Sequence, residues 1–178
     1  MRTHQCIGAV LTAAFFVAPA TAGAESSSDL SLFSISKSEN RNQVVYAVRV
    51  DDACHPVGDA PVHAYWRMLE KGPVAMEPLL SREERAYGMV SQETALVAGT
   101  GDRVVRLRLR ALPDRTIVVR TAKSSESCTA TAVATVAATP VSLFNVHARL
   151  RMIFGLESLT LTGRATESGV VLRETLKP

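Results

Sequence analysis

The sequence predicts an all-β domain, an antiparallel β-sandwich or partly closed barrel with one short helix. Two observations carry this prediction. Apolar and polar residues alternate with a period of two through most of the chain after residue 24, as they do in strands that bury one face. Turn-forming residues separate these runs at short intervals, which is typical of sandwiches and barrels.

The clearest strand is expected at 103–111, where Val105, Leu107 and Leu109 alternate with arginines. A tight turn is expected at Leu112–Arg115, because proline presets φ and aspartate hydrogen-bonds its own backbone. Residues 116–121 would then return as the partner strand of a hairpin.

Six further segments show the same alternation, and Trp66 is in phase with the apolar face of its segment. We therefore expect Trp66 to belong to the core. The six expected strands are 43–51, 61–70, 128–136, 141–154, 158–164 and 170–176, the last two joined by a turn at 165–169.

One segment departs from the strand pattern. Ser81 is followed three residues later by Glu84, the spacing of a capping box, and Gly88 is a natural stop. We expect a short helix at 82–87.

The first 24 residues have the layout of a secretory signal peptide: a basic start, an apolar run at 7–18, and small residues at a cleavage site near Ala22 or Ala24. The run is shorter than the roughly 20 residues that a membrane-spanning helix needs. The predicted organisation is a signal peptide at 1–24 and a single β-rich domain at 25–178, periplasmic or secreted and not membrane-spanning.

Export changes how the cysteines are interpreted. Removal of residues 1–24 leaves Cys54 and Cys128. In an oxidising compartment two distant cysteines most simply form one disulfide, and the alternative is a pair of buried free thiols.

Charge and motifs exclude several functions. The formal net charge of +3 is small, and with export it argues against nucleic acid as a partner. Ser34 and Lys37 match the S-x-x-K pattern, but in a strand they would point to opposite faces. His55, His63 and His147 fit no metal-ligand spacing. We expect no metal, no cofactor and no catalytic residue from these patterns.

Basic residues form one stripe, made by Arg106, Arg108 and Arg110 with Arg120 on the partner strand. The stripe could hold an anionic ligand or an envelope component. The simpler interpretation is a solvated sheet face.

Two polar patches are the candidate ligand site. The connection 37–42 is longer than a hairpin needs and is dense in functional groups. Residues 63–67 combine aromatic side chains with an arginine, as binding surfaces often do. The predicted ligand-binding residues are Lys37, Asn40, Asn42, Tyr65 and Arg67.

These features favour a binding or envelope-associated module that displays the loop 37–42 to a partner. The alternative is a periplasmic enzyme of hydrolase type, with a polar site around Lys37, Glu39, His63 and Tyr65. An enzyme requires these side chains to converge in a concave pocket. A third class, an assembly partner, would instead show an open strand edge at 170–176.

The segments 33–46 and 61–67, together with Ala86-Tyr87-Gly88, resemble exported bacterial proteins of the family called domain of unknown function 4833. The resemblance covers nearly the whole chain after residue 24. It implies a single domain and supplies no activity or catalytic residues.

Overall fold

A computed structural model describes residues 27–71, 75–99, 102–150 and 156–177 of the chain. The predicted signal peptide lies outside these residues. The described chain is mostly β, with one short helix among eleven strands of a mixed, largely antiparallel sheet that does not close. The strands are β1 (Ser28–Lys37), β2 (Gln43–Val50), β3 (Val62–Arg67), β4 (Met76–Pro78), β5 (Met89–Leu96), β6 (Arg103–Leu109), β7 (Leu112–Lys123), β8 (Cys128–Val136), β9 (Thr139–Leu150), β10 (Leu156–Ala165) and β11 (Val171–Leu176).

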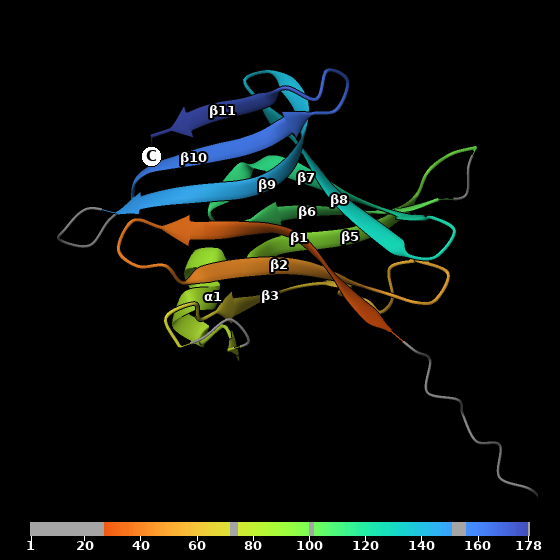
Figure 1. Ribbon diagram of the computed structural model, residues 1–178, viewed down its shortest axis with the longest axis horizontal. Coiled ribbons are helices and arrows are strands. Elements are labelled where there is room, and N and C mark those ends of the chain that lie inside the picture. The colour runs from red at the N-terminus through yellow and green to blue at the C-terminus, as the bar shows by residue number, and fades with distance from the viewer. Residues whose placement is uncertain (1–26, 72–74, 100–101, 151–155, 178) are drawn as a thin grey trace, which may run out of the picture.

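The sheet divides into two wings at β9. The first half of β9 pairs with β8, through residues such as Leu143 opposite Ala132. The second half pairs with β1, in the parallel match of Val146 with Ile35. The first wing is therefore β4-β3-β2-β1 and the second wing is β5-β6-β7-β8, while β10 and β11 continue the sheet on the other side of β9 (Figure 1).

The core fills the space between the two wings. Phe33, Ile35 and Tyr46 of the first wing belong to one apolar cluster with Leu107 and Ile117 of the second wing. All five side chains are buried, because period-two alternation sends every second residue of each strand inward. The predicted arginine strand confirms this rule, since Val105, Leu107 and Leu109 are buried and the alternating arginines are exposed.

Two further contacts link the wings. The side-chain amide of Gln92 on β5 accepts a hydrogen bond from the Val62 N–H and donates one to the Val62 carbonyl on β3, both at 3.0 Å. At the end of the molecule remote from α1, a Cys54–Cys128 disulfide joins the β2–β3 connection to the start of β8, with the two Cα atoms 5.4 Å apart. The disulfide prediction is confirmed.

The prediction of a hairpin turn at Leu112–Arg115 was wrong. These residues begin β7, and Leu109 pairs directly with Leu112, so the turn consists of Arg110 and Ala111. Neither turn residue has the positive φ of the usual two-residue hairpin turns, and Pro113 is tolerated near the start of a strand.

The helix α1 (Ser81–Tyr87) is confirmed with a correction at its start. Leu80 rather than Ser81 precedes the first turn, and the Glu83 carboxylate accepts a hydrogen bond from the Leu80 N–H at 2.9 Å. Gly88 ends the helix as expected, with its N–H donating to the Glu84 carbonyl. The predicted capping pair of Ser81 and Glu84 was therefore wrong by one residue.

Strands β4 and β5 were not predicted. β4 has three residues, and β5 has exposed and half-buried residues on both of its faces, so neither shows a clean alternation. The strand expected at 141–154 begins earlier, at Thr139, and its last four residues lie outside the described part of the chain.

Candidate functional site

A pocket lies between the wings, at the end where β1 finishes. We call it the end pocket. It has a volume of about 720 Å³. Its lining comes from α1, from the β6–β7 turn and the start of β7, and from the ends of β9, β10 and β11 that meet there.

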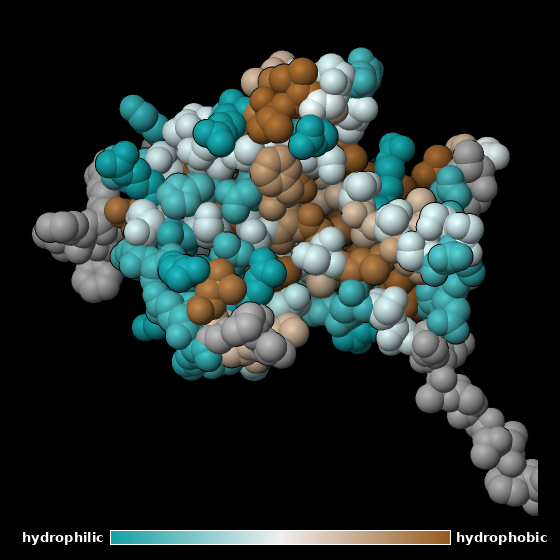
Figure 2. Space-filling view, viewed as in Figure 1, coloured by the Kyte–Doolittle hydropathy of each residue, from teal (hydrophilic) through white to brown (hydrophobic). Residues whose placement is uncertain are grey.

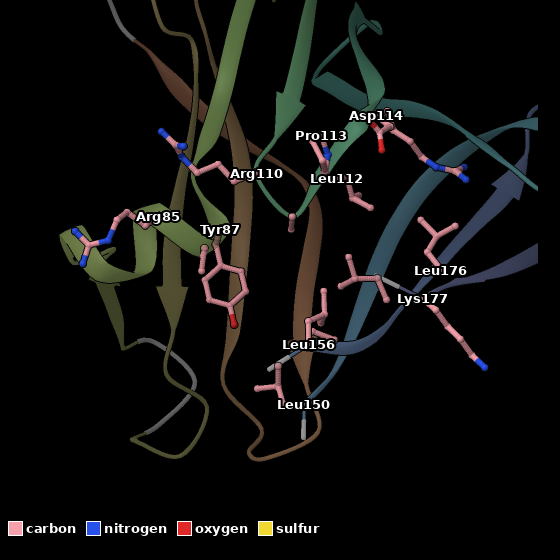
Figure 3. A pocket seen from close by; sticks show the side chains of 15 residues that line it. Arg85, Tyr87, Arg110, Leu112, Pro113, Asp114, Leu150, Leu156, Leu176 and Lys177 are labelled. Atoms are coloured by element: carbon pink, nitrogen blue, oxygen red, sulfur yellow. The ribbon is translucent and has the colours of Figure 1, made fainter. Parts of the chain in front are cut away.

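The floor of the end pocket is apolar. Leu159 pairs with Ala148 on one side and with Leu176 on the other, so that the three side chains form a row on the inner face of the sheet. Leu150 pairs with Leu156 one step further out. Figure 3 shows Tyr87, Leu112, Leu150, Leu156 and Leu176 around one common space.

Tyr87 forms one wall of the end pocket. Its ring packs edge-on against Trp66, with the ring centroids 5.8 Å apart. Its backbone carbonyl accepts a hydrogen bond from the buried Tyr46 hydroxyl. Burial raises the pKa of the Tyr87 phenol, and the nearby carboxylates of Glu39 and Glu83 raise it further. The phenol is therefore a neutral group at neutral pH.

Cations stand at the mouth of the end pocket. Arg85, Arg110, Arg115 and Lys177 belong to its lining, against one carboxylate, Asp114. Arg115 is committed to Glu174, with nitrogen–oxygen distances of 2.9 and 2.6 Å. Arg85 and Lys177 extend away from the apolar space on opposite sides (Figure 3).

The predicted ligand-binding residues divide between two faces of the sheet. Lys37, Asn40 and Asn42 line a smaller pocket of about 350 Å³ together with Trp66. Within it the Lys37 ammonium lies 4.6 Å from the centroid of the Trp66 ring. We call this the Trp66 pocket.

Tyr65 and Arg67 do not join this group. Both alternate with the buried Trp66 along β3 and so point to the outer face of the first wing. The Arg67 guanidinium donates a hydrogen bond to the Gln43 side chain at 2.8 Å. His63, on the same face, lies 3.3 Å from the Asp29 carboxylate. Lys37 and Tyr65 therefore do not converge, and the predicted hydrolase site has no common pocket.

Asn42 has a structural role in the loop. It is buried, and its side chain accepts a hydrogen bond from the Glu70 N–H and lies 3.5 Å from the Glu70 carboxylate. Its own N–H donates to the Asn40 side chain. These contacts fix the β1–β2 connection against the β3–β4 connection.

The outer face of the sheet around β9 is polar. Ser36 lies 3.0 Å from Nδ1 of His147, and the Asn145 amide lies 3.4 Å from the hydroxyls of both Ser34 and Ser36. Figure 2 shows this side of the molecule, on which hydrophilic and neutral side chains surround several apolar ones. As expected, Ser34 and Lys37 point to opposite faces, so the S-x-x-K pattern forms no site.

The arginine stripe lies on the outer face of the second wing. Arg106 stands opposite Glu93 of β5 in the strand register, and the Arg108 guanidinium lies 3.5 Å from the Ser91 hydroxyl. Arg120 is instead at the margin of a third pocket, beside the disulfide. Arg110 lies in the β6–β7 turn and belongs to the lining of the end pocket, with its guanidinium pointing outward (Figure 3).

The described residues offer neither a metal site nor a membrane-spanning helix. They contain no group of three or more histidine, cysteine, aspartate or glutamate side chains placed to hold a metal ion. Their helix is too short to cross a membrane.

Sequence reasoning missed the end pocket. Its leucines alternate like core residues, and only the pairing of strand ends shows that they face open space. The fold and this pocket define a β-rich, open-sheet domain with an apolar cavity between its wings. The chain belongs to the family called domain of unknown function 4833 (DUF4833), whose model matches residues 33–174. No curated protein and no solved structure matches the chain.

Proposed function

We propose that this protein is an exported binding module that holds an apolar ligand in the end pocket. The observation that carries the proposal is an open space of about 720 Å³ bordered by Leu112, Leu150, Leu156 and Leu176. This volume lies within the roughly 300–1,000 Å³ that small-molecule sites occupy, and such sites are lined mainly by apolar and aromatic groups.

The energetics favour an occupant. Protein interiors are packed about as densely as organic crystals, so an unfilled apolar space forgoes dispersion contacts. Burying one methylene contributes about 0.8 kcal/mol. A chain of about ten methylenes would contribute about 8 kcal/mol, which exceeds the lower estimates of about 4 kcal/mol for lost translational and rotational freedom.

Export belongs to the same proposal. The signal-peptide pattern of residues 1–24 supports it, with cleavage near Ala22 or Ala24 and a periplasmic or secreted product. The Cys54–Cys128 disulfide is consistent with an oxidising compartment. An envelope-associated role follows if the ligand is a component of the cell envelope.

The loop 37–42 is proposed as an accessory part of the site. Its Glu39 carboxylate lies near enough to Tyr87, a wall of the end pocket, to raise the pKa of the Tyr87 phenol. It also lines the Trp66 pocket on the other side of the Trp66–Tyr87 contact. A ligand that displaces Tyr87 would therefore disturb both pockets.

The test uses Trp66 as a built-in reporter, because it is the only tryptophan of the chain and it contacts Tyr87. Dodecanol, an uncharged probe, is titrated into the protein while Trp66 emission is recorded. We expect saturable binding with a shift in emission. The absence of any saturable change, together with no heat of binding by calorimetry, would overturn the proposal.

A pocket-filling variant tests the location. The double substitution Leu150→Phe/Leu156→Phe adds volume at a paired position of the floor, so we expect at least a tenfold loss of dodecanol affinity. The matched control is Leu96→Phe, because Leu96 is 71% exposed on β5 and does not line the pocket. Thermal unfolding checks that both variants fold. Equal affinity in a folded double variant would place the ligand elsewhere.

A further inference from the structure

The mouth of the end pocket carries more positive charge than the apolar floor requires. Arg85, Arg110 and Lys177 form no ion pair with acidic side chains of the described residues, whereas Arg115 is neutralised by Glu174. Asp114 is the one carboxylate of the lining. Among the side chains that line the pocket, this leaves an excess of two positive charges.

The position of these cations matches a ligand with two chemically distinct ends. Arg85 and Lys177 extend away from the apolar space into solvent (Figure 3). Long basic side chains commonly bury their carbon stems along apolar surface and keep the charged head hydrated. An apolar chain on the leucine floor would thus emerge among guanidinium and ammonium groups.

We infer that the ligand of the end pocket is an acyl chain that ends in an anionic group. The inference rests on the proposed function and specifies its ligand. The chain would lie over Leu150, Leu156 and Leu159, and the anionic group would lie beside Arg110 with Arg85 as its neighbour. Arginine suits this role because its planar donors can bind a carboxylate or a phosphate in a bidentate manner.

The acidic groups near the pocket decide on which side the anionic group lies. Glu39 and Glu83 both act electrostatically on Tyr87. They would repel an anion placed at the Tyr87 hydroxyl. Arg110 follows the last residue of β6, and its N–H donates to the Gly88 carbonyl, so its backbone is held beside Tyr87. Figure 3 shows the Arg110 side chain pointing away from the Tyr87 hydroxyl and from the carboxylates that act on it.

The experiment compares probes that share a chain length and differ in the head group: dodecanoate, dodecyl phosphate, dodecanol and dodecyltrimethylammonium. Each is titrated below the concentration at which it forms micelles, with Trp66 emission and calorimetry as readouts. We expect at least one anionic probe to bind about tenfold more tightly than dodecanol, with an advantage that shrinks as salt is added. The better of the two anions identifies the source as a carboxylate or a phosphate.

Charge-removing variants assign the effect to the mouth. Arg85→Gln/Arg110→Gln should lower the affinity for the preferred anion about tenfold and change the dodecanol affinity less than twofold. The control Arg120→Gln removes an exposed arginine that lines a different pocket, and it should change neither affinity. Both affected side chains are exposed, so the variants are expected to fold.

The outcomes separate the two proposals. Binding of dodecanol as tight as that of both anions, or tightest binding of the cationic probe, would overturn the anionic ligand and leave the apolar pocket standing. A double variant that weakens dodecanol as much as the anion would also overturn it. Failure of all four probes to bind would overturn both proposals.

Discussion

At the scale of single residues, one ion pair connects parts of the chain that no strand pairing joins. Arg115 on β7 and Glu174 on β11 form two parallel nitrogen–oxygen contacts, at 2.9 and 2.6 Å. The Glu174 carboxylate also accepts a hydrogen bond from the Ala137 N–H. Both charged side chains are about three-quarters buried, which makes the pair stronger than a typical surface salt bridge.

Glu174 should make stability depend on pH. Hydrogen bonds from Arg115 and from the Ala137 N–H lower the pKa of the Glu174 carboxyl. A folded-state pKa below the unfolded value of about 4.3 adds stability that is fully present above that value. The contribution is lost as the pH falls through the folded-state pKa. We expect Glu174→Gln to cost about 1–2 kcal/mol at pH 7, and the difference from the wild type to narrow below about pH 4.

Urea unfolding at pH 7 and at pH 3 measures this difference. The control is Glu167→Gln, because Glu167 is exposed in the β10–β11 turn and has no ion-pair partner in the described chain. Surface substitutions of this kind change stability by less than about 0.5 kcal/mol. A Glu174→Gln cost that stays constant between the two pH values would contradict the assignment.

Single residues were predicted well where alternation alone decides their environment. Trp66 is buried as expected, and the arginines of β6 are exposed. The Arg115–Glu174 pair could not be predicted, because 59 residues separate its partners and neither position stands out from the surrounding charges. The role of Gln92 could not be predicted either. Its side-chain amide makes two hydrogen bonds with the Val62 backbone, as a neighbouring strand would.

At the scale of elements, strands were predicted better than turns. The boundaries of β8 match the prediction, because its small side chains follow the period-two pattern of a strand from Cys128 to Val136. The β6–β7 turn was misplaced because Pro113 and Asp114 have strong turn preferences, yet they lie inside β7. The actual turn uses Arg110 and Ala111, which have no such preference.

The β8–β9 turn shows why such positions escape sequence analysis. Ala137 and Ala138 both adopt left-handed backbone conformations, with φ of 48° and 61°. A two-residue hairpin turn of type I′ requires positive φ at both positions and ordinarily uses Asn-Gly. Two alanines give no turn signal, and they hold this conformation at a cost of about 1 kcal/mol or more each.

The strain predicts a stabilising substitution. Ala138→Gly should raise the free energy of unfolding by about 1 kcal/mol, because glycine adopts positive φ without a Cβ clash. The same change at Ala122, an exposed position inside β7, should lower it by about 0.5–1 kcal/mol. Chemical denaturation of the two variants beside the wild type measures both. Effects of equal sign at the two positions would contradict the turn assignment.

At the scale of the whole molecule, the arrangement of the wings determines the pocket. β8 pairs with the first half of β9 and β1 pairs with its second half, so the two wings branch from β9 at different positions along its length. The inner face of β9, β10 and β11 is therefore left uncovered at one end, where the end pocket forms. The parallel β1–β9 pair joins residues more than 100 positions apart. No local pattern reports such a pairing, so the all-β class was predictable and the pocket was not.

The disulfide should stabilise the molecule without shaping the pocket. Cys54 and Cys128 are 74 residues apart and tie the two wings together at the end opposite the end pocket. In the chain-entropy model, a closed loop of this length contributes about 4 kcal/mol. We expect Cys54→Ser/Cys128→Ser to lower the free energy of unfolding by about 4 kcal/mol, measured by urea unfolding.

The folded fraction of this variant, assayed at low temperature, should bind dodecanol with unchanged affinity. Leu150, Leu156 and Tyr87 lie on strands and a helix that the disulfide does not touch, so they should keep their positions. A loss below about 1 kcal/mol would mean that the β9 junction and Gln92 hold the wings unaided. Lost dodecanol binding in a folded variant would mean instead that the spacing of the wings is set from the disulfide end.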